Sequence, residues 1–314
     1  MSADTDTGRT CLLVLNTRSR GGEEHADAIV EAIGRAGWTL AGDGPVAPED
    51  FPAALEAHRG RLARASGRIL VGGGDGTVHH LLPELMAAGL PVAVLPLGTA
   101  NDLARTLGLS LDPHEALETA LAGRLARIDL GRVNDTPFAN VASIGLGPEV
   151  TERLSASMKR DLGIAGYPLA LLRAYREVRP FRCRVTVDGE RVPRFRAIHL
   201  AVGNGRYYGG GATVFSDARI DDQTLHFFGL SPEPFWRLVL KLPWLALGYH
   251  RQLSNIRTLH GRTLELRISR PLPISADGEL VAETPARFEV LEGALVVVVP
   301  ETPDGPGLGA AGDR

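Results

Sequence analysis

Short apolar runs alternate with helix-like periodicity over the first 130 residues of the chain. We predict strands at 11–15, 69–71 and 92–95, and helices at 23–35, 78–88, 100–107 and 114–122. Strands and helices in alternation favour a parallel sheet with helices on both faces. Such sheets bind ligands at the carboxyl ends of their strands, so the loops that follow the strands are candidate sites.

Beyond about residue 130 the pattern changes to period-two alternation, which is typical of strands that follow one another directly. We predict strands at 181–187, 195–202, 225–230, 263–268, 286–291 and 294–299, and helical stretches at 149–179 and 233–249. The pairs Asp188-Gly189 and Glu292-Gly293 are predicted turns between strands. The prediction is therefore an α/β domain over 10–130, a mostly β, sandwich-like domain over 131–300, and a disordered tail over 301–314.

Charge and composition exclude two classes of function. The net charge of −3 provides no broad basic stripe, which argues against a nucleic-acid partner. Lys159 and Lys241 are the only lysines among the 34 Lys and Arg residues, and no Gly-x-x-x-x-Gly-Lys run occurs. The P-loop class is therefore excluded.

The cysteines and the N-terminus indicate the compartment. Cys11 and Cys183 lie far apart in strand-like runs, so we expect reduced thiols in the core. The polar first ten residues do not resemble a secretion signal, and no apolar run approaches the ~18 residues of a spanning helix. We expect a cytoplasmic protein.

The strongest local signal is the run Val-Gly-Gly-Gly-Asp-Gly-Thr at 71–77, which follows a predicted strand and precedes a predicted helix. Consecutive glycines bring backbone N–H groups close to an anion, and the helix N-terminus adds partial positive charge. A phosphate fits there without a lysine, although a plain glycine-rich turn is the alternative explanation. That alternative does not explain Asp75, because a carboxylate beside a phosphate requires a divalent cation such as magnesium between them.

Two further loops end predicted strands in the same way. Residues 95–102 (Leu-Pro-Leu-Gly-Thr-Ala-Asn-Asp) open a predicted helix, with Thr99, Asn101 and Asp102 as candidate caps. Residues 16–22 (Asn-Thr-Arg-Ser-Arg-Gly-Gly) supply arginines beside a glycine pair. Because several strand ends carry glycine and polar residues, we interpret these loops as parts of one site rather than as isolated turns.

In this order, the three runs resemble the catalytic domain of diacylglycerol kinases, which sphingosine, ceramide and bacterial lipid kinases share. Segments 140–147, 202–205, 209–213 and 277–279 match in order too, so the resemblance covers nearly the whole chain. The Gly-Gly-Asp-Gly-Thr run also occurs in NAD kinases, whereas the paired run at 96–104 is much more specific. The resemblance implies a nucleotide-binding α/β domain and a β-sandwich-like second domain.

The resemblance also implies roles for individual residues. It places the nucleotide on Asn16, Thr17, Arg18, Ser19, Arg20, Gly74, Asp75, Gly76, Thr77, Val78, His79, His80 and Thr99. Asp75 and Asp102 would organise catalytic magnesium and water, and Glu279 would be the general base. His79 and His80 depart from the family, which commonly has an Asn-Glu pair there.

A loop at 218–225 resembles the family's Asp-Gly-x-Leu loop, which holds a structural magnesium in bacterial members. The matching ligands are the side chain of Asp222 and the backbone carbonyls of Arg219 and Thr224. Gln223 stands where the family usually has glycine. If this position needs a positive φ, glutamine strains it.

The activity that the resemblance implies is magnesium-dependent transfer of the ATP γ-phosphate to a hydroxyl of a diacylglycerol-like or sphingoid-like lipid, as in phospholipid biosynthesis. Two alternatives stay open: a kinase of a soluble hydroxyl substrate, as NAD kinases are, and a nucleotide-binding regulatory module without turnover. The expected partner is the lipid. Segment 235–245, rich in aromatic residues and leucine, fits either a peripheral membrane contact or a helix packed on the β domain. A homodimer formed through the edges of the β domain also stays open.

Overall fold

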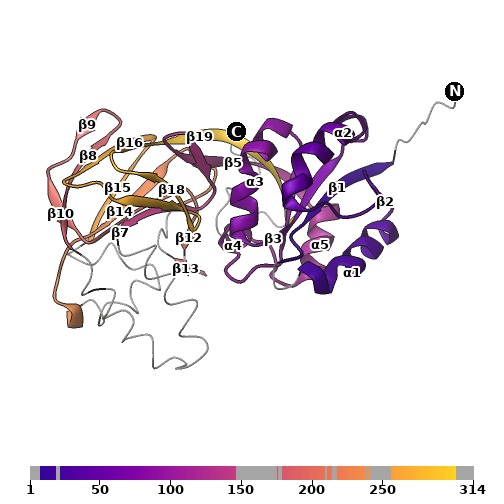
Figure 1. Ribbon diagram of the computed structural model, residues 1–314, viewed down its shortest axis with the longest axis horizontal. Coiled ribbons are helices and arrows are strands. Elements are labelled where there is room, and N and C mark those ends of the chain that lie inside the picture. Colours follow the sequence, from indigo (N-terminus) through magenta and orange to yellow (C-terminus); the bar gives the residue numbers. More distant parts are fainter. Residues whose placement is uncertain are drawn as a thin grey trace. The chain divides into compact units, whose positions relative to one another are not determined.

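The computed structural model describes residues 8–18, 22–145, 175, 179–208, 211–213, 218–237, 240 and 256–301. The chain divides into two compact units (Figure 1). Unit 1 comprises Met1–Ile128 and Gly293–Arg314, and unit 2 comprises Asp129–Glu292. The predicted helix at 149–179, most of the one at 233–249 and the tail beyond 301 lie outside the described residues.

Unit 1 is built on parallel strands. In spatial order these are β4 (Val92–Pro96), β3 (Arg68–Gly73), β1 (Arg9–Leu15) and β2 (Trp38–Leu40). The last part of β19 (Ala286–Val299) adds a further parallel neighbour, because Val297 pairs with Val92 of β4. The parallel sheet predicted from the sequence is confirmed.

Helices cover both faces of the unit 1 sheet, as predicted (Figure 1). They are α1 (Gly22–Arg35), α2 (Phe51–Arg64), α3 (Asp75–Ala88), α4 (Asp102–Thr106) and α5 (Pro113–Ala122), with a 3₁₀ turn, η1, at Pro48–Asp50. Side chains of α1 and α5 share one buried cluster with Cys11, Leu13 and Leu15 of β1. Strand β2 and helix α2 are absent from the sequence prediction. Only Phe51, Leu55 and Leu62 of α2 are buried, which is too sparse a stripe to stand out as a period.

Unit 2 consists of antiparallel strands that enclose one apolar core. One set comprises β10 (Phe195–Ala197), β8 (Phe181–Val187), β16 (Thr263–Ile268) and the first part of β19, with β9 (Glu190–Arg191), β6 (Thr136–Phe138) and the end of β5 (Arg124–Val133) alongside. The other comprises β15 (Ile256–Gly261), β14 (Leu225–Leu230), β11 (His199–Gly203), β7 (Val141–Gly145), β17 (Pro273–Ala276) and β18 (Glu279–Glu283). A short pair, β12 (Tyr207–Tyr208) and β13 (Ala212–Thr213), stands apart. Phe138, Phe227 and Phe288 are among the fully buried side chains of this core.

Three predicted strands differ from the structure. The strand predicted at 195–202 is two strands, β10 and β11, which belong to different sheets and part at Ile198, whose N–H donates to Leu230 O at 2.9 Å. The strands predicted at 286–291 and 294–299 are one strand, β19, which continues through Gly293 at φ 52°. The turn predicted at Glu292-Gly293 is therefore wrong, whereas Asp188-Gly189 does link β8 to β9.

The continuous β19 also changes how the chain is divided. It pairs with β16 through Ala286–Glu289 in unit 2 and with β4 through Val297 in unit 1. Unit 1 is consequently made of two separate stretches of chain, whereas the sequence boundaries at 10–130 and 131–300 assume two continuous ones. The difference arises because alternation alone does not show which strand is the partner of a C-terminal strand.

Both cysteines are buried and free, as expected. Burial raises the pKa of the Cys11 thiol and of the Cys183 thiol to about 12 each, since a thiolate is disfavoured away from water. No helix among the described residues is long and apolar enough to cross a membrane.

We expect His199 to make unit 2 sensitive to acid. Burial lowers the pKa of its imidazole from 6.5 to about 4, so the folded state stays neutral where the unfolded chain takes up a proton. Stability from this residue is complete above pH 6.5 and falls as the pH falls towards 4. The melting temperature of His199→Gln, measured between pH 7 and pH 4, should decline less than that of the wild type; equal slopes would contradict the assignment.

Candidate active site

Three loops meet at the carboxyl ends of β1, β3 and β4 in unit 1. Asn16, which follows β1, donates a hydrogen bond from Nδ2 to Thr77 Oγ1 at 2.9 Å. Its Oδ1 accepts the N–H of Arg18 at 3.1 Å, which fixes the first turn of the loop after β1. The sequence predicts these loops as separate strand ends, and the structure joins the first to the second.

The second and third loops touch through glycine. A Cβ atom built on Gly98 would lie 2.4 Å from the Cα of Gly74, and one on Gly74 would lie 3.1 Å from the Cα of Gly98. No side chain fits in that space, so glycine is required at both positions for the loops to approach. A chemically useful consequence is that backbone N–H groups, rather than side chains, line this part of the strand ends.

Asp75 locks the third loop to the second. Its Oδ2 accepts the N–H of Asp102 at 3.1 Å and its Oδ1 accepts the N–H of Leu103 at 3.0 Å. These are the first amides of α4, which have no acceptor within their own helix. Asp75 therefore acts as the N-terminal cap of a helix that begins 27 residues later.

The candidate caps of the sequence prediction have other roles. Asn101 occupies the N-cap position of α4 with φ 52°, but its side chain accepts the N–H of Gly98 at 3.1 Å and donates to Pro96 O and Gly98 O. Asn101 thus holds the loop after β4 in shape. Asp102 is buried, at 6% exposure, and Thr99 is exposed.

The N-terminus of α3 is suited to bind a phosphate. This helix is 14 residues long and starts at Asp75, and its N-cap, Gly74, contributes no side-chain cap. Gly76, in the first turn, is exposed, which leaves this helix end and its partial positive charge within reach of a ligand. Val78 and His79 are buried whereas His80 is exposed, so only His80 of the two histidines presents its ring to solvent.

The remaining residues of the first loop are only partly described. Arg18 is exposed and its guanidinium pairs with Glu49 of η1 at 3.1 Å. Thr17 is exposed beside it. Ser19 and Arg20 lie outside the described residues.

Glu279 begins β18 at the tip of the β17–β18 hairpin in unit 2. The two-residue loop is Asp277-Gly278, with φ values of 49° and 99°, and Ala276 pairs with Glu279 across it. Glu279 is exposed, and its carboxylate forms no hydrogen bond or ion pair with any residue that the structure describes. A carboxylate in this state is free to accept a proton from a ligand.

Asp277 has a structural role instead. Its carboxylate accepts three backbone N–H groups, from Ala139 at 2.7 Å, Asn140 at 2.9 Å and Val141 at 3.1 Å. Its own N–H donates to Val141 O at 2.9 Å. Asp277 therefore fastens the hairpin that carries Glu279 to the start of β7.

Parts of three motif segments of the second half, 140–147, 202–205 and 277–279, converge around Asn140. Its carbonyl accepts the N–H groups of Asn204 and Gly205 at 2.8 and 3.0 Å. The amide of Asn204 is buried and donates to Asp129 O and Ala139 O, both at 2.9 Å. These segments lie far apart in sequence, and the structure shows that they share one hydrogen-bonded framework under the hairpin.

The loop at 219–224 is folded around the carboxylate of Asp222. Oδ1 accepts the N–H of Thr224 at 2.9 Å, and Oδ2 accepts the N–H of Arg219 at 3.1 Å and lies 3.0 Å from Nε2 of His226. Gln223 adopts φ 58°, the left-handed conformation that favours glycine, and its N–H donates to Asp129 Oδ2 at 2.7 Å. Among the described residues, no group of three His, Cys, Asp or Glu side chains is placed to hold a metal ion. For a cation, the loop offers one free lone pair of Asp222 and backbone carbonyls, which is a partial ligand set.

Family models match both halves of the chain. The diacylglycerol kinase catalytic domain matches residues 10–133, and the YegS C-terminal NAD kinase beta sandwich-like domain matches residues 140–299. The chain belongs to the YegS and diacylglycerol kinase family. The family membership predicted from the ordered motifs is therefore confirmed.

Relatives of this family cover almost the entire chain. A protein named "Probable lipid kinase YegS-like" from Pseudomonas aeruginosa PAO1 is 37% identical over 294 residues, which is 92% of this chain and 94% of the relative. A protein of the same name from Chromohalobacter salexigens is 34% identical and covers 92% and 93%.

Solved structures of the family share the fold. The crystal structure of a diacylglycerol kinase from Bacillus anthracis strain Sterne superposes with a TM-score of 0.73 at 22% identity, over 94% of this chain and 98% of that one. An NAD kinase from Archaeoglobus fulgidus in complex with ATP superposes with a TM-score of 0.52 at 15% identity, over 93% and 94%. Both the α/β first domain and the β-rich second domain of the sequence prediction are confirmed at the level of fold.

Sequence reasoning did not find Asp129 and His226, which contact the loop at 219–224. Asp129 lies in β5, a strand that was not predicted from the sequence. His226 is one of the alternating residues of β14, and nothing in the sequence distinguishes it from the others. A signal was present in one case only: a carboxylate in an otherwise apolar run, such as Asp129 in Ile-Asp-Leu-Gly, must be paired when it is buried.

Proposed function

We propose that the protein is an ATP-dependent lipid kinase that transfers the γ-phosphate to a hydroxyl of a diacylglycerol-like or sphingoid-like lipid. The observation that carries the proposal is the Asp75 carboxylate, which joins the glycine-rich loop after β3 to the loop after β4 by accepting two amides of α4. A plain βα turn needs no such lock. The lipid as acceptor is supported by relatives that carry the name of lipid kinases.

In this proposal the two halves of the chain supply different chemistry. Backbone N–H groups at the start of α3 bind phosphate oxygens, with Asn16 and Thr77 fixing the loop that presents them. Asp75 and Asp102 would hold Mg²⁺, which would supply charge neutralisation on the transferred phosphoryl group. Glu279 accepts the proton of the attacking hydroxyl, since its carboxylate has no other partner among the described residues.

Turnover with a small panel of acceptors tests the proposal. The purified protein is incubated with labelled ATP and magnesium, and with diacylglycerol, sphingosine, ceramide or NAD⁺. We expect phosphorylation of a lipid. Phosphorylation of NAD⁺ alone would favour the second candidate, a kinase of a soluble hydroxyl, which the NAD kinase-like fold supports. Nucleotide binding without turnover on any acceptor would favour a regulatory module.

The proposed setting is the cytoplasm, with a peripheral contact to the membrane that contains the lipid and no nucleic-acid partner. The part of segment 235–245 that the structure describes includes Trp236 and Leu240, exposed to 58% and 63%, which supports an interfacial contact more than burial against the β domain. Strands β15 and β18 are the ends of their sheet, and a homodimer through such an edge remains part of the proposal.

Gly98→Ala is expected to weaken nucleotide binding by at least about tenfold, because the new methyl group meets Gly74 at 2.4 Å and pushes the two loops apart. Isothermal titration with ATP and magnesium measures the effect. Gly60→Ala in α2 is the matched control, since nothing lies within 4 Å of a Cβ there. Wild-type affinity in Gly98→Ala would show that the close approach is not needed for binding.

Asp222→Ala is expected to lower the melting temperature even without magnesium, because two backbone N–H groups and His226 lose their acceptor. We further propose that Asp222 Oδ1 and the carbonyls of Arg219 and Thr224 bind Mg²⁺. In that case added magnesium raises the melting temperature of the wild type more than that of the variant. If magnesium changes the melting temperatures of both proteins equally, the loop that contains Gln223 is stable without a bound cation.

A further inference from the structure

The outward face of β8, β10 and β16 carries a concentration of arginine. Alternate residues of β8 are buried, at Phe181, Cys183 and Val185, so the residues between them point to the opposite face. The exposed basic residues on this face and on the adjoining β9 and its loop are Arg182, Arg184, Arg191, Arg194, Arg196 and Arg267. We call these six residues the arginine face.

Strand register places like charges directly opposite each other on the arginine face. Arg196 of β10 pairs with Arg182 of β8, and Arg184 of β8 pairs with Arg267 of β16. Side chains opposite each other in an antiparallel pair are about 5 Å apart at Cβ, where like charges destabilise the sheet. On the neighbouring strand β19, in contrast, Nε of Arg287 lies 3.5 Å from a carboxylate oxygen of Glu289, so an arginine there has an acidic partner.

No carboxylate neutralises the arginine face within the described part of the chain. None of its six arginines forms an ion pair with a described residue, although the whole chain has a net charge of −3. Glu265 is the one acidic residue among those that line the hollow in this face. An anion from outside the chain would therefore meet a net positive charge, with four arginines against one glutamate in the hollow.

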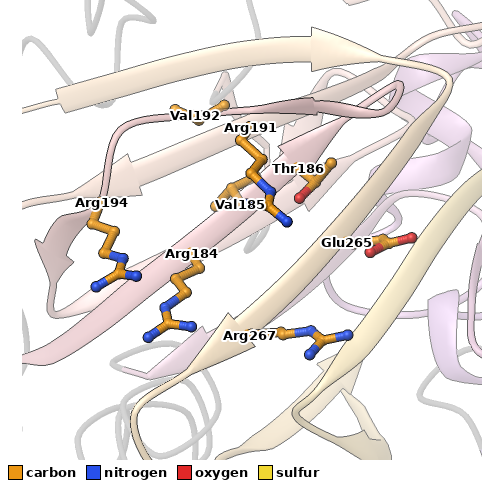
Figure 2. A pocket seen from close by; sticks show the side chains of 8 residues that line it. All are labelled: Arg184, Val185, Thr186, Arg191, Val192, Arg194, Glu265 and Arg267. Atoms are coloured by element: carbon orange, nitrogen blue, oxygen red, sulfur yellow. The ribbon is translucent and has the colours of Figure 1, made fainter.

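The face is hollowed where its strands meet. A cavity of about 280 Å³ is lined by Arg184, Val185, Thr186, Arg191, Val192, Arg194, Glu265 and Arg267 (Figure 2). Figure 2 shows the arginine side chains reaching it from three segments: β8, the β9 strand with its following loop, and β16. Guanidinium groups bind phosphate oxygens through paired N–H donors, and the Thr186 hydroxyl adds a further donor.

We propose that the arginine face binds the phosphate groups of anionic phospholipids at a bilayer surface. A soluble phosphate would fill the hollow alone, whereas Arg182 and Arg196 lie outside it and extend the face along β8 and β10. A set of charges wider than one anion matches a surface with many headgroups. This inference rests on the proposed function in one respect, because a lipid acceptor is what requires the enzyme to reside on a membrane.

Binding to vesicles tests the proposal. Sedimentation compares the wild type on vesicles of phosphatidylcholine with vesicles in which one third of the lipid is phosphatidylglycerol. We expect at least about tenfold tighter binding to the anionic vesicles, reduced when salt is raised from about 0.1 M to about 0.5 M. Equal binding to both kinds of vesicle would overturn the proposal. This holds even if the protein is found to bind glycerol phosphate or RNA.

The variant Arg182→Gln/Arg267→Gln removes one arginine from each like-charge pair. Its affinity for anionic vesicles should fall about tenfold or more, while its melting temperature should equal or exceed that of the wild type because repulsion is relieved. The control is Arg59→Gln/Arg64→Gln in α2, which changes net charge equally and should bind as the wild type does. Wild-type vesicle binding by Arg182→Gln/Arg267→Gln would overturn the proposal.

Kinase activity separates this inference from the proposed function. With a short-chain lipid dispersed in neutral detergent, Arg182→Gln/Arg267→Gln should keep wild-type turnover, and it should lose turnover on the same lipid in anionic vesicles. If the wild type phosphorylates no acceptor in detergent but prefers anionic vesicles, the proposed function fails and the membrane contact stands. Equal turnover of variant and wild type on the vesicles would count against the contact.

Discussion

Asp75→Asn is expected to abolish phosphoryl transfer and to lower stability only modestly. Asparagine keeps one oxygen acceptor but places an NH₂ group against the amide of Asp102 or Leu103, so one of the two cap hydrogen bonds is lost. Loss of such a bond costs about 1–3 kcal/mol. The charge that is proposed to hold magnesium beside the phosphates disappears entirely, and turnover should fall below detection.

Asp112→Asn provides the matched control for Asp75→Asn. Asp112 caps α5 in the same unit, and its carboxylate accepts the N–H groups of His114 and Glu115 at 2.9 and 3.2 Å. One oxygen of Asp112 accepts both amides, so Asp112→Asn keeps both hydrogen bonds and should retain its melting temperature and its turnover, whereas Asp75→Asn should lose turnover. Wild-type turnover in Asp75→Asn would leave Asp75 with the role of a helix cap alone.

The strand ends of unit 1 could be predicted from sequence because each leaves a local signature. Apolar runs that stop at glycine and polar residues identify a strand end wherever it lies, and parallel strands bring their carboxyl ends to one edge. The bond from Asp75 to α4 leaves no such signature. Helix α4 (Asp102–Thr106) lies within the predicted helix at 100–107, but its cap comes from a different loop, 27 residues earlier in the chain.

The role of Asp277 could not be predicted for a related reason. In sequence it is one of two carboxylates around Gly278 and could substitute for Glu279 as a base. Its three amide partners lie more than 130 residues earlier, at Ala139–Val141, so only the folded chain reveals that its oxygens are already used. The left-handed φ of 58° at Gln223, in contrast, follows from a local comparison with glycine.

Sheet membership was the least predictable part of the fold. Alternation shows that a residue faces a core but not which strand lies beside it. Ile198 therefore looks like the middle of one strand although it separates β10 from β11, and Gly293 looks like a turn although β19 runs through it. Both errors concern the partner of a strand rather than its existence.

Glu279→Gln is expected to retain nucleotide binding and to lose about 10²- to 10⁴-fold in turnover, the usual contribution of a general base. Glutamine preserves the shape of the exposed side chain, and no hydrogen bond to a described residue is lost, so the melting temperature should not change. The loss should appear in kcat rather than in the KM for ATP. Glu283→Gln, at the other exposed end of β18, is the matched control and should be fully active.

Asp277→Asn must be compared with Glu279→Gln by stability as well as by rate. Two of the three amides donate to Oδ1 and one to Oδ2, so asparagine loses one hydrogen bond and the variant should lose about 1–3 kcal/mol of unfolding free energy and part of the anchoring of the hairpin that carries Glu279. An inactive Asp277→Asn with a lowered melting temperature therefore agrees with a structural role. If Glu279→Gln keeps the wild-type kcat while Asp277→Asn is inactive at an unchanged melting temperature, Asp277 is the base and the assignment to Glu279 is wrong.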